Sequence, residues 1–293
     1  MKKNNYKILL IGGSGQVGTE VRFFLDKKDF EILSPSSKDL NLSYAEDLFK
    51  QITSSDIDVV VNLAGFTKVD EAEKYYDLVH EINCLSAQYI AQATSKLNVP
   101  LIHFSTDYIF DGKKDGLYNE TDEAKPINIY GKSKLCSERI IKVHNDKVII
   151  IRTSGVYGLY GKNFFKTVKS LLEKNQEIKV ISNQFTCPTW SYDIAVMLEK
   201  VLKKVLKSDF SNWGVYNFCS KDCISWYEFS EKIQKIFSLD GSLFPISYSN
   251  YESPASRPLN SCLECKKILN VFGVKTQSLD SSLKQLKAIN SKT

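Results

Sequence analysis

The sequence predicts an α/β fold, namely a Rossmann-type, doubly wound parallel sheet with a smaller α/β C-terminal substrate domain. Three observations support this. Short apolar runs that suit strands buried on both faces alternate with segments of helical periodicity over the first half of the chain. A glycine-rich turn joins the first run to a helix, and beyond residue 155 the alternation loosens. We therefore expect one domain from residues 1–160 plus about 186–218, and a second from about 161–185 and 219–293.

The elements follow from apolar patterning and from turn residues. Strands are expected at 7–11, 30–33, 58–65, 101–105, 147–152 and 214–218. Helices are expected after the glycine turn, at 45–53, at 78–97, from residue 129 onward, and at 163–172, 190–206, 225–237 and 278–288. Ser225 has the chemistry of a helix N-cap. At 293 residues, 43% of them hydrophobic, the chain is long enough to bury a sizeable core.

The glycine turn carries the first functional signal. Gly12, Gly15 and Gly18 form a GxxGxxG pattern, with Gln16 and Val17 inside it, directly between strand and helix. Such glycines allow a tight turn, close backbone approach to a pyrophosphate, and close contact between helix and strand. The helix N-terminus adds free N–H groups and a positive dipole end. The pattern predicts a dinucleotide site.

The residues after the second strand bear on the choice of cofactor. An NAD-selective site often has an acidic residue here that binds the adenosine ribose 2′-hydroxyl. The sequence instead reads Ser34-Pro35-Ser36-Ser37-Lys38. Hydroxyls and a lysine suit a 2′-phosphate, so we expect NADPH, with NADH possible.

Small and polar residues follow four of the expected strands. They are residues 12–18, Ala64-Gly65, Ser105-Thr106 and Thr153-Ser154. In open α/β sheets, ligands bind in the crevice at the carboxyl ends of the strands. The four segments should therefore meet at one site.

Tyr130 and Lys134 stand four residues apart at the start of an expected helix. This spacing puts both side chains on one helix face. A tyrosine ordinarily ionises near pH ~10, and a neighbouring ammonium favours the phenolate. We therefore expect Lys134 to lower the pKa of Tyr130 towards the range used in acid–base catalysis.

Composition excludes several other classes of function. The net charge of +5 comes from scattered lysines without a basic, aromatic cluster, so no nucleic-acid partner is expected. No apolar run reaches the ~20 residues of a membrane span, and no signal peptide is evident, so we expect a cytoplasmic protein. Seven cysteines, an odd number, fit a reducing cytosol. Cys262-x-x-Cys265 has no second pair of this kind, so no metal site is expected.

With these motifs the chain resembles the extended short-chain dehydrogenase/reductases, and among them the family of dTDP-4-dehydrorhamnose reductases. The similarity runs nearly end to end. Its most specific stretch is Ser105-Thr106-Asp107-Tyr108-Ile109-Phe110-Asp111-Gly112. Further matching segments are 12–18, 67–73, 118–122, 130–134, 152–154, 188–189 and 255–258.

The resemblance implies roles for single residues. Tyr130 would be the general acid, Lys134 would hold the nicotinamide ribose, and Thr106 would hydrogen-bond the substrate carbonyl. The cofactor would contact Gly12, Gly15, Gln16, Val17, Gly18, Asp39, Leu40, Ala64, Gly65, Thr67, Tyr130 and Lys134. The sugar nucleotide would contact Thr106, Asp107, Tyr108, Asn163, Gln184, Thr189 and Arg257. Asn83 resembles a helix asparagine of the family that buttresses the site. A monomer or a homodimer is expected.

The implied reaction is NAD(P)H-dependent reduction of the C4 ketone of a dTDP-4-keto-6-deoxy-L-sugar, with dTDP-4-dehydro-L-rhamnose as the expected substrate. One departure concerns the sugar: the family usually has a tryptophan where this chain has Gly155, and neither Trp190 nor Trp226 can be assumed to replace it. A 4,6-dehydratase usually has a glutamate after the aspartate, and here Tyr108 follows Asp107. Another 4-ketoreductase, a 4-epimerase, and a non-catalytic regulatory subunit of the methionine adenosyltransferase type remain alternatives.

Overall fold

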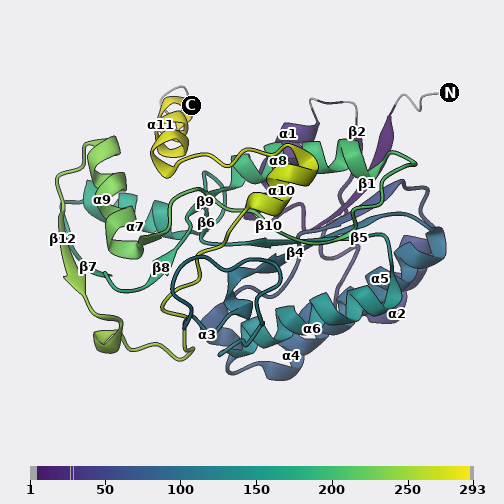
Figure 1. The fold of residues 1–293 in the computed structure, drawn as a ribbon, viewed down its shortest axis with the longest axis horizontal. Helices are drawn as coiled ribbons and strands as arrows, with labels where there is room; N and C mark the ends of the chain where they lie inside the picture. Colours follow the sequence, from purple (N-terminus) through teal and green to yellow (C-terminus); the bar gives the residue numbers. More distant parts are fainter. Residues whose placement is uncertain (1–4, 27, 29, 291–293) are drawn as a thin grey trace.

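A six-stranded sheet forms the centre of the molecule in a computed structural model that describes residues 5–26, 28 and 30–290 (Figure 1). The strand order is β10-β5-β4-β3-β1-β2, and all neighbouring strands run parallel. The strands are β1 (Tyr6–Ile11), β2 (Phe30–Leu33), β3 (Val59–Asn62), β4 (Leu101–Thr106), β5 (Val148–Thr153) and β10 (Gly214–Asn217). The predicted fold class is confirmed. The outer ends of the predicted domains, residues 1–4 and 291–293, lie outside the described residues.

Helices cover both faces of this sheet because its strands are apolar on both sides. Ile8 and Leu10 belong to the core on one face, whereas Leu9 and Ile11 belong to the core on the other. The first face is covered by α1 (Gln16–Leu25), α8 (Ser191–Val205) and α10 (Lys266–Phe272). The second is covered by α2 (Ala45–Thr53), α5 (Ser86–Leu97) and α6 (Ile129–His144).

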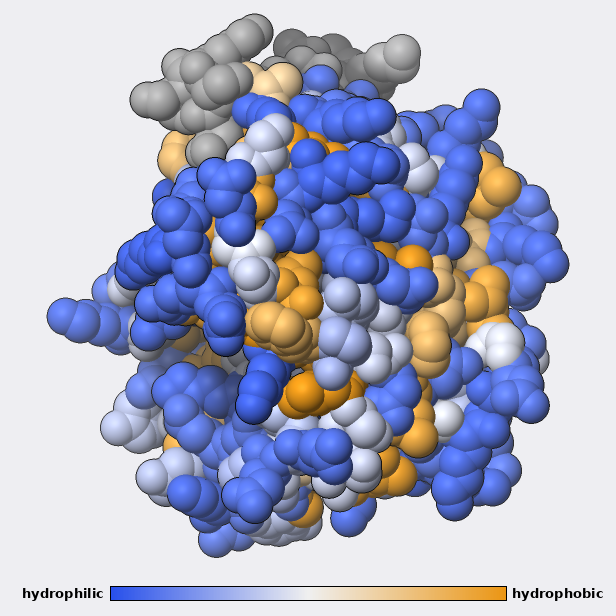
Figure 2. Space-filling model, turned by 90° about the vertical axis from the view of Figure 1, so that its left-hand side faces the viewer, coloured by the Kyte–Doolittle hydropathy of each residue, from blue (hydrophilic) through white to orange (hydrophobic). Residues whose placement is uncertain are grey.

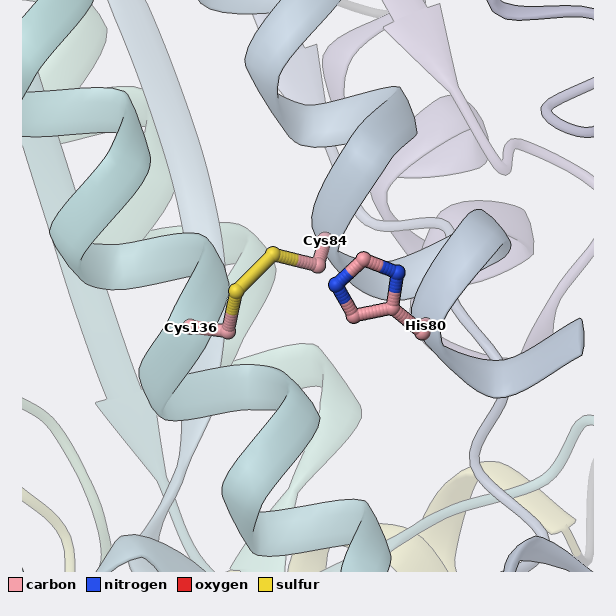
Figure 3. Close-up of side chains that lie close together, drawn as sticks. All are labelled: His80, Cys84 and Cys136. Atoms are coloured by element: carbon pink, nitrogen blue, oxygen red, sulfur yellow. A yellow bond between two sulfur atoms is a disulfide. The ribbon is translucent and has the colours of Figure 1, made fainter. Parts of the chain in front are cut away.

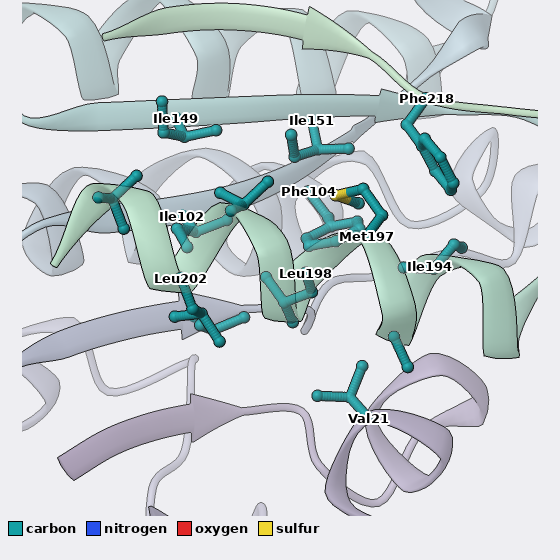
Figure 4. Packing of buried hydrophobic residues seen from close by; sticks show 14 of the residues in the cluster. Val21, Ile102, Phe104, Ile149, Ile151, Ile194, Met197, Leu198, Leu202 and Phe218 are labelled. Carbon is teal, nitrogen blue, oxygen red and sulfur yellow. The ribbon is translucent and has the colours of Figure 1, made fainter. Parts of the chain in front are cut away.

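The packing of α8 shows how the first face is closed (Figure 4). The buried side chains on this helix include Ile194, Met197, Leu198 and Leu202, and those of the strands include Ile102, Phe104, Ile149 and Ile151. Each of these eight residues is at most 8% exposed. Burial of this extent, at about 25 cal/mol per Å² of apolar surface, supplies the main stabilisation of the sheet.

The segment between β3 and β4 differs from the predicted single helix at 78–97. Two short helices, α3 (Val69–Ala72) and α4 (Tyr76–His80), lead into a π-helical segment, η1 (Glu81–Leu85), which continues as α5. A π segment widens the turn by one residue and is often found at functional sites. Periodicity alone does not reveal it, because the chain stays helical throughout.

The C-terminal half builds a second, smaller core. Helices α7 (Phe164–Glu173), α9 (Trp226–Phe237) and α11 (Leu279–Asn290) enclose a cluster that includes Tyr157, Trp190 and Phe229. Ser225 caps α9 in a capping box with Glu228, as its sequence position predicted. Beside these helices, β7 (Glu177–Ile181) pairs in parallel with β12 (Ser242–Ile246).

Several short elements were not predicted from the sequence. They are β6 (Val156–Tyr157), β8 (Phe185–Thr186), β9 (Thr189–Trp190), β11 (Ile224–Ser225), η2 (Asp107–Ile109) and η3 (Tyr248–Asn250). Two- or three-residue elements carry no periodicity to detect. The face formed by this end of the molecule is mostly hydrophilic, with smaller hydrophobic areas between (Figure 2). Within the described residues, every helix is too short or too polar to cross a membrane.

The cysteines differ from the expectation of a fully reduced chain. Disulfides join Cys84 to Cys136 and Cys223 to Cys262, whereas Cys187, Cys219 and Cys265 are free. The Cα atoms of the pairs are 5.7 and 5.6 Å apart, a separation that a disulfide spans. The partners lie 52 and 39 residues apart in the sequence, so spacing did not indicate them.

Candidate active site

A cavity of about 660 Å³ opens at the carboxyl ends of the strands. It lies at the point where β1 has β2 on one side and β3 on the other, the switch point where such sheets bind ligands. The predicted residues that line it are Gly12, Gly15, Gln16, Val17, Gly18, Leu40, Ala64, Gly65, Thr67, Thr106, Asp107, Tyr108, Tyr130 and Lys134. The structure therefore brings together the four strand ends that the sequence pointed to.

The glycine turn packs too closely for side chains. Gly12 has a φ of +85°, and a Cβ atom there would lie 2.7 Å from the backbone nitrogen of Ala64. A Cβ at Gly18 would lie 2.1 Å from the carbonyl oxygen of Gly12. These contacts hold α1 against the turn and leave its first N–H groups facing the cavity.

The turn also has free hydrogen-bonding capacity. Gly15, the N-cap of α1, provides no side-chain cap. In the described part of the chain, Gln16 Nε2 and Thr153 Oγ1 are buried without a hydrogen-bond partner, and both residues line the cavity. Buried polar groups are normally paired, so these atoms and the uncapped helix fit a dinucleotide with polar groups of its own.

Asp39, which follows β2 in the sequence, does not line the cavity. Its carboxylate accepts hydrogen bonds from Ser36 Oγ at 2.6 Å and from the Ser36 backbone nitrogen at 3.3 Å, closing a local turn. The next residue, Leu40, is buried and does line the cavity, together with Ser37. A hydroxyl rather than a carboxylate is therefore offered at the end of β2.

Helix α6 positions the Tyr–Lys pair. Asn128 caps the helix by accepting a hydrogen bond from the Gly131 backbone nitrogen at 2.7 Å, and its amide donates to the Ser256 carbonyl at 2.8 Å. A Cβ at Gly131 would lie 2.1 Å from the carbonyl oxygen of Tyr108. The glycine between Tyr130 and Lys134 thus lets the helix touch η2, next to Thr106.

The expected lowering of the Tyr130 pKa is wrong. Burial raises the pKa of Tyr130 to about 12, with Asp107 adding to the shift and a hydrogen bond with Thr106 opposing it. Burial likewise lowers the pKa of Lys134 to about 8, against the pull of Glu138. Desolvation dominates both shifts, and the helix spacing alone could not indicate this.

A buried histidine missed by sequence analysis lies behind Lys134. His103 is 1% exposed, and its Nε2 is 3.2 Å from Lys134 Nζ and 3.2 Å from Ser137 Oγ. Its Nδ1 is 3.2 Å from the amide nitrogen of Asn62, whose oxygen accepts from the Ala64 backbone nitrogen. Nδ1 is therefore the acceptor, which places the proton of the neutral ring on Nε2.

This tautomer has a consequence for Lys134. Ser137 Oγ donates to the Lys134 carbonyl and can accept the Nε2–H of His103, so the ring does not have to direct this proton at the Lys134 ammonium. Burial and Lys134 together hold the pKa of His103 well below its usual value, so the ring stays neutral.

Asp107 organises the polar wall next to Tyr130. It is 3% exposed and accepts hydrogen bonds from Thr106 Oγ1 at 3.0 Å and from Ser154 Oγ at 2.7 Å. Burial raises the pKa of Asp107, although these hydrogen bonds oppose the shift. The rings of Tyr108 and Tyr130 meet edge to face, 6.2 Å apart.

Asn83 ties the loop after β3 to α6. Its oxygen accepts from the Phe66 backbone nitrogen at 2.7 Å, and its amide donates to Ser133 Oγ at 2.8 Å. A Cβ at Gly65 would lie 2.8 Å from the Asn83 oxygen. Asn83 belongs to the π segment η1. Its hydrogen bonds support the loop after β3 and the start of α6, which is the buttressing role named for the family asparagine.

A buried ion pair links α6 to the sheet. Arg152 donates to Glu138 at 3.0 Å through Nε and at 2.7 Å through Nη2, and Ser105 Oγ also donates to this carboxylate. Arg152 and Glu138 are 4% and 1% exposed. The paired geometry links α6 to β4 and β5, one helical turn beyond Lys134.

Four residues expected at the sugar nucleotide do not line this cavity. Asn163 caps α7, Gln184 donates to the Pro258 carbonyl at 3.0 Å, and Thr189 donates to the Cys187 carbonyl at 2.8 Å. Arg257 pairs with Asp70 at 2.7 Å. Burial raises the pKa of Tyr108, and the positive charge of Arg257 opposes this rise.

Two residues of the cavity wall concern position 155, where the family usually has a tryptophan. Gly155 lines it with a φ of +51°, a conformation that other residues rarely adopt. Trp226, from the start of α9, lines the same cavity and packs against Phe164 with ring centroids 4.5 Å apart. Trp190, by contrast, is 1% exposed in the second core.

A Rossmann-type sheet with a glycine turn, and a Thr–Tyr–Lys set around one cavity, define the class as the extended short-chain dehydrogenase/reductases. The family model described as the RmlD substrate binding domain matches residues 6–290. A dTDP-4-dehydrorhamnose reductase from Aggregatibacter actinomycetemcomitans is 34% identical over 96% of this chain and 98% of its own length. The chain therefore belongs to the RmlD substrate binding domain family, with the dTDP-4-dehydrorhamnose reductases.

Solved structures agree with this assignment. The crystal structure of a dTDP-4-dehydrorhamnose reductase from Clostridium acetobutylicum is similar, with a TM-score of 0.92 and 32% identity, covering 97% of this chain and 99% of that one. A dTDP-4-dehydrorhamnose reductase from Bacillus anthracis, in complex with NADP, has a TM-score of 0.92 and 30% identity over the same shares.

Proposed function

We propose that this protein is an NADPH-dependent oxidoreductase that reduces the C4 ketone of a dTDP-4-keto-6-deoxy-L-sugar, with dTDP-4-dehydro-L-rhamnose as substrate and dTDP-L-rhamnose as product. The observation that carries the proposal is the position of Thr106, Tyr130 and Lys134 on one cavity, next to a glycine turn that fits a dinucleotide. The names of the relatives supply the substrate.

The chain's own residues account for the proton. NADPH, when bound, supplies the hydride for the C4 carbon. The raised pKa keeps Tyr130 protonated at neutral pH, so its phenol can donate a proton to the C4 oxygen. Thr106 holds that oxygen beside the phenol, and Lys134 compensates the negative charge that Tyr130 is left with.

The remaining site residues are assigned to two groups. The glycine turn, Leu40, Ala64, Gly65 and Thr67 hold the cofactor, and Ser37 lies where a 2′-phosphate can be accommodated. Asp107, Tyr108 and Trp226 face the sugar. Arg257 suits the diphosphate, because a guanidinium binds phosphate oxygens bidentately. When the diphosphate binds, Arg257 would either break its ion pair with Asp70 or contact Asp70 and the phosphate together.

We also propose a role for each part of the chain. Residues 1–160, with about 186–218, bind the cofactor, and residues of about 161–185 and 219–293 bind the sugar nucleotide. We further propose a cytoplasmic monomer or homodimer. NADH replaces NADPH as a poorer donor, because the hydroxyls and the lysine after β2 favour a 2′-phosphate.

An NADPH-oxidation assay with a panel of 4-keto sugar nucleotides tests this proposal. We expect turnover with dTDP-4-dehydro-L-rhamnose, a higher kcat/KM with NADPH than with NADH, and a product with the L-rhamno configuration by NMR. Interconversion of 4-epimers without net NADPH consumption would identify an epimerase instead. Binding without any turnover would favour a regulatory subunit.

A further inference from the structure

Three metal-ligating side chains, none of which lines the cavity, lie close together (Figure 3). His80 and Cys84 stand four residues apart on the run from α4 into η1, so they share a face. Cys136 comes from α6. The ligand atoms of the three residues all lie within 4.8 Å of one another, and the two sulfur atoms are joined in the disulfide. A ring nitrogen of His80 is turned towards the sulfur atoms (Figure 3).

The donor set has a specific chemistry. Two thiolates and one imidazole nitrogen are ligands that Zn²⁺ prefers, and three protein ligands leave a fourth position open for water. Cys84 is 1% exposed, whereas His80 and Cys136 are half-buried. The cluster is thus closed on its inner side and accessible to solvent on its outer side. The ring of Tyr76 stacks on His80 with centroids 6.3 Å apart, which restricts the imidazole.

We propose that His80, Cys84 and Cys136 form a three-ligand Zn²⁺ site that alternates with the Cys84–Cys136 disulfide. A dithiol reductant gives the disulfide two electrons and two protons, and is itself oxidised to a disulfide. Zn²⁺ then binds the two sulfurs and His80, and the two thiol protons leave to solvent. The metal keeps its oxidation state throughout.

The position of the site gives both states a mechanical effect. Cys84 follows Asn83, whose amide bonds to Ser133, and Cys136 follows Lys134 by two residues. Either the disulfide or a bound Zn²⁺ joins η1 to α6 at the level of the residues proposed for catalysis. The reduced, metal-free state has no such covalent or metal link. Disulfides are rare in the cytosol, so Zn²⁺ would be the link that persists under reducing conditions.

The test uses the full chain, reduced with a phosphine that binds Zn²⁺ weakly, with thiols counted before and after. Zn²⁺ binding is measured by competition with a chromophoric chelator, and Co²⁺ is added as a spectroscopic probe. We expect one Zn²⁺ per reduced chain, none at this site in the oxidised chain, and a thiolate-to-cobalt charge-transfer band. Zn²⁺ should also raise the Tm of the reduced chain.

Variants locate the ligands. Cys84→Ser and Cys136→Ser should each lower the intensity of the charge-transfer band, and the double variant should abolish it, whereas His80→Ala should weaken Zn²⁺ binding at least tenfold. His144→Ala, a histidine at the end of α6, should bind like the wild type. Cys265→Ser tests the other close thiol pair, since Cys265 Sγ lies 3.4 Å from Cys219 Sγ.

Two results would overturn the proposal. One is a reduced wild-type chain, confirmed folded by circular dichroism, that binds no Zn²⁺. The other is Zn²⁺ binding that survives Cys84→Ser and His80→Ala but is lost in Cys265→Ser. Neither result depends on turnover, so the proposed reductase activity can stand or fail independently.

Discussion

Tyr130 carries its proton throughout the neutral range, because burial raises its pKa to about 12. In the proposed reaction it would therefore start as the acid and be left as a phenolate. Lys134 is the cation that would stabilise this phenolate, although burial lowers its own pKa to about 8. At pH 7 a lysine with this pKa is still mostly protonated. Tyr130 is then neutral and Lys134 is positively charged, as the proposed reaction requires.

Removal of the phenol tests this role. Tyr130→Phe should lower kcat by about 10²–10⁴-fold, the usual contribution of a positioned proton donor. The Kd for NADPH should change little, since the ring remains. Tyr108→Phe is the matched control at the neighbouring ring, and should lose less. Near wild-type turnover by Tyr130→Phe would remove the tyrosine from the proton-transfer step.

The lowered pKa of Lys134 makes a prediction about stability. Between about pH 8 and pH 10.5 the unfolded chain holds the proton on this lysine and the folded chain does not. Stability should therefore rise with pH in this window, by on the order of 3 kcal/mol for this group. Lys134→Met removes this contribution to the pH dependence of stability.

Denaturant unfolding of both proteins across that window measures the difference. The wild type should gain stability relative to Lys134→Met as the pH rises. A difference that stays constant would mean that Lys134 is not desolvated as described.

Some residues of the site could be identified from the sequence, whereas others could not. Thr106, Tyr130 and Lys134 belong to compact motifs, and their separation along the chain determines their arrangement. His103 and Asn62 meet only because β3 and β4 are neighbours in the sheet. The sign of the Tyr130 shift depends on burial, which spacing does not contain.

At the scale of elements, the contacts that hold α6 include its N-cap, the η2 contact at Gly131, and the Arg152–Glu138 pair. Loss of one partner of a buried pair leaves the other charge uncompensated. Arg152→Met should therefore destabilise the protein by about 3–5 kcal/mol. The double variant Arg152→Met/Glu138→Leu should be less destabilised than the single variant. Equal losses in denaturant unfolding would argue against an energetic role for the pairing.

Helix α9 provides a second prediction, because its first residue faces the cavity. An aromatic contact contributes about 0.5–1.5 kcal/mol beyond its buried area, so Trp226→Ala should raise KM for the sugar nucleotide by roughly 2–10-fold. The KM for NADPH should stay near the wild-type value. Tyr227→Ala, at the next position, is the control. If Trp226→Ala affects only the KM for NADPH, this aromatic wall belongs to the cofactor.

Elements with strong local signals were predicted well. The strands of the main sheet, the glycine turn and the capped start of α9 are determined by nearby residues. The π segment η1 and the two-residue strands of the second half were missed, because tertiary contacts decide them. Trp226 was set aside for the same reason: its sequence position, far from Gly155, gives no sign that both line one cavity.

At the scale of the whole molecule, the Rossmann-type part of the chain and the C-terminal half both contribute residues to one cavity. The first part supplies the glycine turn and the Tyr–Lys pair, and the C-terminal half supplies Trp226, whereas Arg257 lies outside the lining. The loss of strand–helix alternation beyond residue 155 is the pattern from which the sequence predicts two domains. The two disulfides were not predictable, since each joins segments that only the fold brings together.

The most direct test follows the hydride into the sugar. The wild-type chain is incubated with dTDP-4-dehydro-L-rhamnose and NADPH deuterated at the transferable position, and the product is analysed by NMR. The proposed function predicts one deuterium at C4, the L-rhamno configuration, and one NADPH consumed per product. Product without deuterium at C4, or NADPH oxidation without a reduced sugar, would contradict it.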